Sequence, residues 1–258
     1  MTATILPSGL EGVAAAELSS QASARLLAAY PEHLDRVEGN TLIWRDGTRM
    51  PIDDGKGVKP FEQWLDEPDI EDILSVPYPE GAPADPPAKD TDPGRARNAA
   101  FFDKVYGDCT RGEVTKNMTT VVWLPKKAGQ RLSVSKVNGA AKALDAVSKA
   151  LDELPASFDV YLKPSAGTYN CRVIAGTKRK SAHGQGIAID IALKHAHYWR
   201  NEKPGKDGTY AFRNEIPMEI VKIFEDHGFI WGGRWYHFDT MHFEYRPEFL
   251  AAPKRPKN

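Results

Sequence analysis

The longest regular apolar pattern in the chain lies between residues 137 and 154. Its apolar positions are three or four residues apart for most of its length and comprise Val137, Ala140, Ala141, Leu144, Val147, Leu151 and Leu154. That spacing places them on one face of an α-helix, and Pro155 ends the pattern because proline cannot continue a helix. The pattern predicts a helix that packs against the core and carries no chemistry.

Two further segments have helical character. Residues 217–227 begin at a proline, which suits the start of a helix, and Gly228 follows as a common helix stop. The apolar face of this segment comprises Ile220, Ile223 and Phe224. Residues 12–30 are rich in alanine, which predicts another helix near the N-terminus.

Short apolar and alternating segments predict β-strands. Residues 40–55 contain two alternating runs on either side of Asp46-Gly47, and this dipeptide favours the tight turn of a β-hairpin. Four more segments are typical of short strands, at residues 157–162, 171–175, 186–192 and 240–245. Helices grouped with short antiparallel strands, without a repeating strand–helix–strand order, predict an α+β fold with a small antiparallel sheet and flanking helices.

A proline-rich segment separates the two halves of the chain. Six prolines fall between residues 77 and 93, among Asp, Ala and Gly. This composition is typical of an extended linker or of a strap that lies along a surface. We therefore expect an N-terminal extension with a helix and a hairpin at residues 1–76, a linker at 77–94 and the main domain at 95–258.

Charge and hydropathy exclude several classes of protein. The 258 residues include 34 Lys and Arg against 35 Asp and Glu, so the chain lacks the basic excess of a dedicated nucleic-acid binder. No apolar run approaches the roughly 18–20 residues of a membrane span. The first residues lack the basic start and apolar core of a signal peptide, although a mature exported form would look the same.

The chain has two cysteines, Cys109 and Cys171. Two are too few for a zinc site made of cysteines alone. We favour two free buried thiols over a single disulfide, which would form if the protein is exported.

The first chemically informative segment runs from Ser181 to Ala192. In a strand over residues 186–192, alternate side chains point to opposite faces, so Asp190 shares its face with alanines. A carboxylate among apolar residues is costly unless it is paired or binds a metal. His183 lies just before this strand, and glycines between them let the chain bend back.

The second informative segment runs from Gly228 to Tyr245. In a strand over 240–245, His242 and Glu244 share one face. His183, Asp190 and His242 would then form a set of three ligands with room for a water, which is typical of catalytic rather than structural zinc. Asp239, three residues before His242, could accept a proton from a metal-bound water without being a ligand.

Two other histidines form an alternative metal-binding pattern. His195 and His197 have His-x-His spacing, which places both rings on one face of a strand. They lie among Lys194, Tyr198 and Arg200. We favour a role at the surface or behind the ligands for this pair.

At these positions the sequence resembles a family of zinc peptidases with a hedgehog-type fold, which includes D-alanyl-D-alanine carboxypeptidases and endolysin-like L-alanyl-D-glutamate endopeptidases. The family pattern Ser-x-His-x-x-Gly-x-Ala-x-Asp matches Ser181, His183, Gly186, Ala188 and Asp190, and Asp239-x-x-His242 follows. A Gly-Phe-x-Trp-Gly-Gly-x-Trp run precedes Asp239, as in the endopeptidase-like branch. The resemblance covers roughly residues 101–247.

The resemblance implies one zinc ion per chain, bound by His183, Asp190 and His242, with Asp239 as the catalytic acid/base. Some branches have Glu at the last position, so Asp is an accepted variant. Arg172 corresponds in placement to an arginine that holds the substrate carbonyl or carboxylate, and Ser181 would hydrogen-bond in the pocket.

The same resemblance implies a function in the cell wall. The substrates would be peptidoglycan stem peptides, and residues 95–258 would be the zinc peptidase catalytic domain of a monomer. This substrate implies an extracytoplasmic location, in the periplasm or at the cell wall. The residues leave open whether the enzyme acts as a carboxypeptidase or as an endopeptidase.

Two alternatives to an active enzyme belong to other classes. Hedgehog-type domains use the same architecture as zinc-containing binding modules, which need no carboxylate three residues before the last histidine. A cell-wall anchoring protein with a degenerate peptidase domain would not need the intact set of ligands and base. Because this chain has all four residues, we favour the peptidase.

Overall fold

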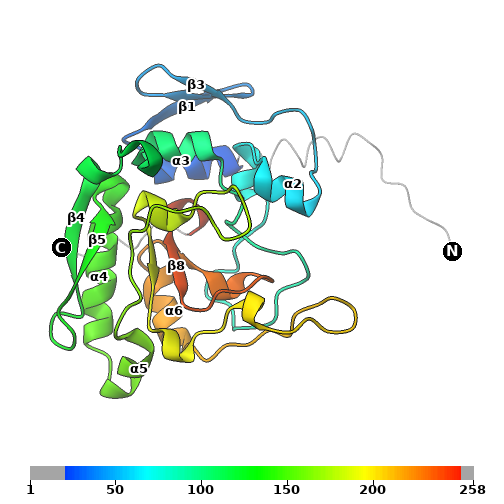
Figure 1. Ribbon diagram of the computed structural model, residues 1–258. Helices are drawn as coiled ribbons and strands as arrows, with labels where there is room; N and C mark the ends of the chain where they lie inside the picture. The colour runs from blue at the N-terminus through cyan, green and yellow to red at the C-terminus, as the bar shows by residue number, and fades with distance from the viewer. Residues whose placement is uncertain (1–20, 251–258) are drawn as a thin grey trace.

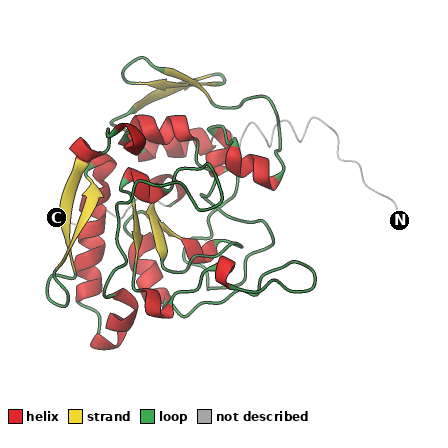
Figure 2. Ribbon diagram, viewed as in Figure 1, coloured by secondary structure: helices red, strands yellow, loops and turns green. Residues whose placement is uncertain are grey.

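The computed structural model describes residues 21–250 and has the predicted α+β class (Figures 1 and 2). Its strands are β1 (Leu34–Glu38), β2 (Thr41–Trp44), β3 (Arg49–Pro51), β4 (Met118–Trp123), β5 (Gln130–Ser135), β6 (Ala188–Asp190), β7 (Phe229–Trp231) and β8 (His242–Tyr245). Its named α-helices are α2 (Phe61–Asp66), α3 (Ala99–Tyr106), α4 (Ala140–Asp152), α5 (Asp159–Leu162) and α6 (Met218–Glu225). Residues 21–29 are also helical, whereas the first part of the helix predicted at 12–30 lies outside the described residues.

The hairpin predicted around Asp46-Gly47 is confirmed. Strands β2 and β3 pair antiparallel across this turn, and Gly47 has the positive φ of 82° that the turn requires. Strand β1, which was not predicted, pairs with β2 and completes a three-stranded sheet. This sheet lies at the top of the view in Figure 1, next to α3.

The central helix is confirmed as α4. Leu144, Val147 and Leu151 are buried in one apolar cluster with residues of the β4–β5 hairpin and of α6. Helix α4 lies between the β4–β5 hairpin and the sheet that contains β8 (Figure 1). The hairpin itself was not predicted.

The helix predicted at residues 217–227 is confirmed as α6. Pro217 is its N-cap, and Gly228 follows it with a φ of 91°. A Cβ atom at Gly228 would lie 2.9 Å from the Tyr245 ring, so glycine also allows β7 to start close to β8. Phe224 of α6 stacks on Phe243 of β8, with ring centroids 3.8 Å apart.

The sheet that carries the predicted site has the order β6–β8–β7 and is antiparallel. Ile189 and Phe243 belong to the α4–α6 cluster, whereas Ala188 and Ile230 belong to the cluster formed with the N-terminal half of the chain. Both faces of the sheet are therefore covered. This explains why the strand segments are apolar on both sides.

Two predicted strands are wrong. Residues 157–162 form a 3₁₀ turn followed by α5, because Pro155 starts a new helical segment and only Leu162 of α5 is buried. Residues 171–175 form one isolated bridge, Val173 with Lys180, because the chain turns sharply after Ile174.

The proline-rich segment packs along the rest of the protein. The hydroxyl of Tyr78 donates to Glu225 of α6 at 2.7 Å and accepts from the backbone NH of Trp231 at 3.0 Å. Asp92 is fully buried and accepts hydrogen bonds from the backbone NH and the ring of His237. The division of the chain at residues 77–94 stays a prediction.

The expectation of free thiols is wrong, because Cys109 and Cys171 form a disulfide with a Cα–Cα distance of 5.7 Å. It joins the 3₁₀ turn Cys109–Arg111, which follows α3, to the loop before His183. None of the helices within residues 21–250 has the length and apolar character to cross a membrane.

Candidate metal centre

Three elements bring the predicted ligands together. His183 lies in the 3₁₀ turn Ala182–Gln185, and Asp190 and His242 lie in β6 and β8. Asp190 and His242 are directly opposite each other in the antiparallel pair. Directly opposed residues have Cβ atoms about 4.5–5.5 Å apart, so the strand register alone places these two side chains in contact.

The three ligand atoms lie close enough to share one ion. Asp190 Oδ1 is 2.9 Å from His242 Nδ1 and 3.2 Å from His183 Nε2. The two ring nitrogens are 3.2 Å apart. A tetrahedral zinc ion with bonds of about 2.0–2.1 Å holds its ligand atoms about 3.3 Å apart, so this spacing fits zinc.

In each histidine, the ring nitrogen that is not one of the three ligand atoms, called here the outer nitrogen, has a fixed partner. His183 Nδ1 contacts the carbonyl oxygen of Thr168, and His242 Nε2 lies 2.9 Å from Glu244 Oε1. With both outer nitrogens protonated as donors, the inner nitrogens are free to bind a metal. This pairing of ligand histidines with a carbonyl or carboxylate is the usual support of protein metal sites.

Glu244 is a functional residue that the sequence analysis left without a role. It is buried, and it accepts hydrogen bonds from Arg97 Nη1 at 2.8 Å and Arg246 Nη1 at 3.4 Å. Burial alone would raise its pKa, but Arg97 and His242 outweigh burial and lower the pKa. The position of Glu244 two residues after His242 was the available signal, whereas nothing in the sequence linked Arg97 to it.

The charge balance keeps Asp190 ionised. Burial raises its pKa, but the hydrogen bonds from His183 and His242 have the larger effect and lower it. For His242, burial lowers the pKa, and the hydrogen bonds with Asp190 and Glu244 raise it to about 10. A metal ion would therefore displace a proton from His242 on binding.

Asp239 lies at the entrance of β8, where its carbonyl accepts from the backbone NH of His242. Its Oδ1 is shielded from solvent and has no hydrogen-bond partner among the described residues. Burial raises the pKa of Asp239 to about 6. Asp239 is thus a carboxylate near the candidate ligands, and its Oδ1 forms no hydrogen bond with any of them.

The two residues expected to bind substrate differ in their surroundings. Ser181 is buried, and its Oγ accepts from the backbone NH of His183 at 3.3 Å, so it caps the turn that carries this ligand. Arg172 is exposed, and its side chain makes no ion pair or hydrogen bond with residues 21–250. Their roles toward substrate stay predictions.

The remaining histidines of this region lie outside the ligand set. His195 and His197 hold the two oxygens of Glu215, at 2.8 and 3.0 Å. His237 pairs with Asp92. Among the described residues, His183, Asp190 and His242 are the group with histidines whose ligand atoms could surround one metal ion.

Comparison with known families bears out the resemblance. Residues 175–245 match the family model described as D-alanyl-D-alanine carboxypeptidase, and this segment contains His183, Asp190, Asp239 and His242. The search of curated proteins and the search of solved structures gave no match. The predicted resemblance is therefore confirmed over residues 175–245, where the chain is similar to a family of peptidases, that is, of hydrolases.

Proposed function

We propose that this protein is a zinc-dependent peptidase that hydrolyses a peptide bond in peptidoglycan stem peptides. The observation that carries the proposal is the arrangement of His183, Asp190 and His242, whose inner ligand atoms converge while both outer ring nitrogens are engaged. Two nitrogens and one oxygen leave a fourth position open, as in hydrolytic zinc sites. The match to the carboxypeptidase family supports this substrate class.

The residues of the chain have separate tasks in this mechanism. A zinc ion in this site would polarise the scissile carbonyl and lower the pKa of a water to about 7. Asp239 takes the proton from the attacking water and returns it to the leaving amine, for which its unpartnered Oδ1 is available. Glu244 and the carbonyl of Thr168 hold the two imidazoles in the required tautomer.

Arg172 and Ser181 complete the proposal. The exposed guanidinium of Arg172 is free to stabilise negative charge on the substrate carbonyl or carboxylate. Ser181 fixes the turn of His183 through its cap, and its hydroxyl would also hydrogen-bond in the pocket. Both assignments come from the family resemblance.

An extracytoplasmic location belongs to the same proposal. The disulfide between Cys109 and Cys171 supports it, because disulfides persist in oxidising compartments and are rare in the cytosol.

Product analysis tests the function. The zinc-loaded protein is incubated with defined muropeptides, with and without a chelator, and the products are identified by mass spectrometry. Release of D-alanine indicates a carboxypeptidase, and a cut between L-Ala and D-Glu indicates an endopeptidase. We expect one of these products, lost with the chelator and with His183→Ala, whereas zinc-bound protein without any product would contradict the proposal and favour a binding module.

A further inference from the structure

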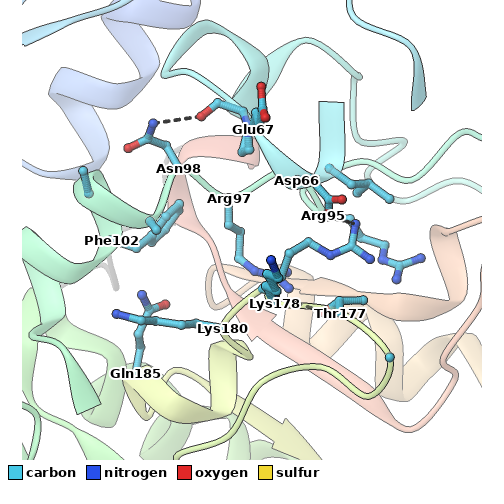
Figure 3. A pocket seen from close by; sticks show the side chains of 16 residues that line it. Asp66, Glu67, Arg95, Arg97, Asn98, Phe102, Thr177, Lys178, Lys180 and Gln185 are labelled. Atoms are coloured by element: carbon cyan, nitrogen blue, oxygen red, sulfur yellow. Dashed lines mark hydrogen bonds and ion pairs between the residues drawn. The ribbon is translucent and has the colours of Figure 1, made fainter. Parts of the chain in front are cut away.

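A second feature lies beside the metal centre, a cavity of about 930 Å³. It is bounded by the end of α2, the segment that leads into α3 and the loop at residues 176–180. Most of its wall comes from residues outside the segment that matches the peptidase family. Figure 3 shows the side chains that line it.

The lining of the cavity is strongly basic. Two carboxylates, Asp66 and Glu67, face five cations in the wall. These cations are Arg95, Arg97, Lys178, Arg179 and Lys180. Figure 3 labels Arg95, Arg97, Lys178 and Lys180 among the side chains that line the cavity.

Three of these cations have close carboxylate partners. Arg95 pairs with Asp92 and Arg97 with Glu244, each at 2.8 Å. Lys180 pairs with Asp103 and Asp108 at 2.7 and 2.8 Å. These partners hold three of the five cationic side chains in place.

Arg179 is different, because its donors are largely unused. Its side chain is 15% exposed, and its nearest carboxylate oxygen, on Asp66, is 3.4 Å from Nη1. Its Nε and Nη1 atoms are shielded from solvent without a hydrogen-bond partner in residues 21–250. Leaving guanidinium donors buried and unpaired is unfavourable, and a charge-assisted hydrogen bond from the guanidinium to a carboxylate would offset this cost.

The cavity is coupled to the metal centre through two of its arginines. Arg97 holds Glu244, which in turn holds His242. Arg95 lies over the Trp235 ring at 5.4 Å, and this ring is 5.6 Å from the His242 ring. The wall of the cavity therefore contacts the side chains that surround His242.

We propose that this cavity is an anion subsite in which Arg179, supported by Arg95 and Lys178, binds a free carboxylate of the peptide substrate. This inference rests on the proposed function and extends it from the chemistry at the metal to the choice of substrate. A stem peptide offers two such groups, the free carboxylate of D-Glu and the C-terminal carboxylate. Through Arg95, the N-terminal half of the chain would also contribute to specificity.

Binding of three synthetic peptides tests the subsite. They are L-Ala-γ-D-Glu-L-Lys-D-Ala-D-Ala and two analogues with one carboxylate each replaced by an amide, at D-Glu or at the C-terminus. Titration calorimetry on the full chain with Asp239→Asn measures affinity without relying on turnover. We expect one analogue to bind about 10- to 100-fold more weakly than the acid, because a charge-assisted pair is lost, and that analogue identifies the carboxylate.

Variants at Arg179 assign the effect. Arg179→Gln should weaken binding of the acid peptide by a similar factor and remove the discrimination against the amide. Arg179→Lys should keep only part of the discrimination between acid and amide, because a lysine lacks the paired donors of arginine. If the Gln variant does not fold, the Lys variant is used for the test instead. Arg131→Gln is the matched control, since Arg131 is an exposed arginine on β5 remote from the cavity lining.

Three results would overturn the subsite. These are equal binding of all three peptides, full discrimination retained by Arg179→Gln, and no measurable binding of the acid peptide. Failure of the proposed function would give a different result. The protein would still discriminate between the acid and amide peptides, but the zinc-loaded parent protein would yield no product.

Discussion

At the scale of single residues, the orientation of His242 depends on side chains that are not themselves candidate ligands. Glu244 holds the outer nitrogen of this histidine, and Arg97 and Arg246 hold Glu244. Because His242, Glu244 and Arg246 are buried and the side chain of Arg97 is only 11% exposed, each depends on its partner for its charge. The orientation of one ligand therefore depends on a row of ion pairs that ends in the N-terminal half of the chain.

Replacing Glu244 by Gln tests this dependence. The variant keeps the shape of the side chain but loses the charge that fixes the tautomer of His242, so zinc affinity should fall about 10- to 100-fold. Competition with a chromophoric chelator measures it, with Glu219→Gln on the exposed face of α6 as control. An unchanged affinity in a folded Glu244→Gln protein would show that the carboxylate does not support the ligand.

The sequence predicted which residues would meet in the metal centre but not what stabilises them. Alternation along two short strands assigned Asp190 and His242 each to one face of its strand, because strand geometry is local and regular. The antiparallel register that sets them opposite each other comes from the structure. Arg97 and the carbonyl of Thr168 reach the centre through tertiary packing, which leaves no periodic trace in the sequence. Nothing in the sequence singled out Arg179 either, because its donors are unpaired only as a result of burial in the folded protein.

At the scale of elements, the turn Ala182–Gln185 connects the first ligand to β6. Gly186 ends this turn with a φ of 69°, and its NH bonds back to the carbonyls of Ala182 and His183. A Cβ atom there would lie 2.8 Å from Met118 Cε and 3.1 Å from the backbone nitrogen of Ser135. The glycine of the family pattern is thus required by backbone conformation and by close packing.

The variant Gly186→Ala separates these two causes when it is compared with Gly112→Ala. Gly112 has a similar φ of 72° but open space around it. Alanine there should lower the free energy of unfolding by about 1–2 kcal/mol, through backbone strain alone. Gly186→Ala should lower the free energy of unfolding by roughly 1–3 kcal/mol more than Gly112→Ala does, because Met118 and β5 must move. Urea unfolding of both variants measures the difference, and equal losses would show that packing against β4 and β5 is unimportant.

Element prediction succeeded where a pattern was long and failed where it was short. Helix α4 was predictable because the apolar positions of the pattern, five of which lie within the helix, repeat at helical spacing, and α6 because its ends have proline and glycine signals. Residues 157–162 were predicted as a strand but form a helix, since six residues do not distinguish the two periods. The β4–β5 hairpin was missed, although it covers α4.

At the scale of the whole molecule, the two halves of the chain share one apolar cluster. Tyr30, Trp44 and Phe101 pack together, and the same cluster includes Ile187 and Ala188 next to the metal centre. The proline-rich segment adds polar anchors, above all the buried Asp92. The composition of residues 77–94 allowed either a linker or a strap, and the contacts made by this segment are those of a strap.

Removing the charge of Asp92 should destabilise the protein in a pH-dependent way. Burial raises the pKa of Asp92, but its hydrogen bond with His237 and the charge of Arg95 outweigh burial and lower it. The folded pKa then lies below the unfolded value of about 4, so the contribution to stability is full above that value and is lost as the pH falls through the folded pKa.

Asp92→Asn should therefore lower the free energy of unfolding by about 3 kcal/mol at pH 7, because a buried ion pair is broken. The difference from the parent protein should shrink as the pH falls below about 4. Denaturant titrations of both proteins from pH 3 to pH 7 measure it. A difference that is constant over this range would contradict a charge-based anchor.

The central claim is that His183, Asp190 and His242 bind zinc while Asp239, which is not a ligand, performs the proton transfer. The most direct measurement compares Asp239→Asn with the parent protein for two quantities, the zinc bound per chain and the turnover of a muropeptide. The account predicts one zinc per chain in both proteins and a loss of turnover of at least about 100-fold in the variant. Retained turnover in Asp239→Asn, or loss of its zinc, would contradict the account.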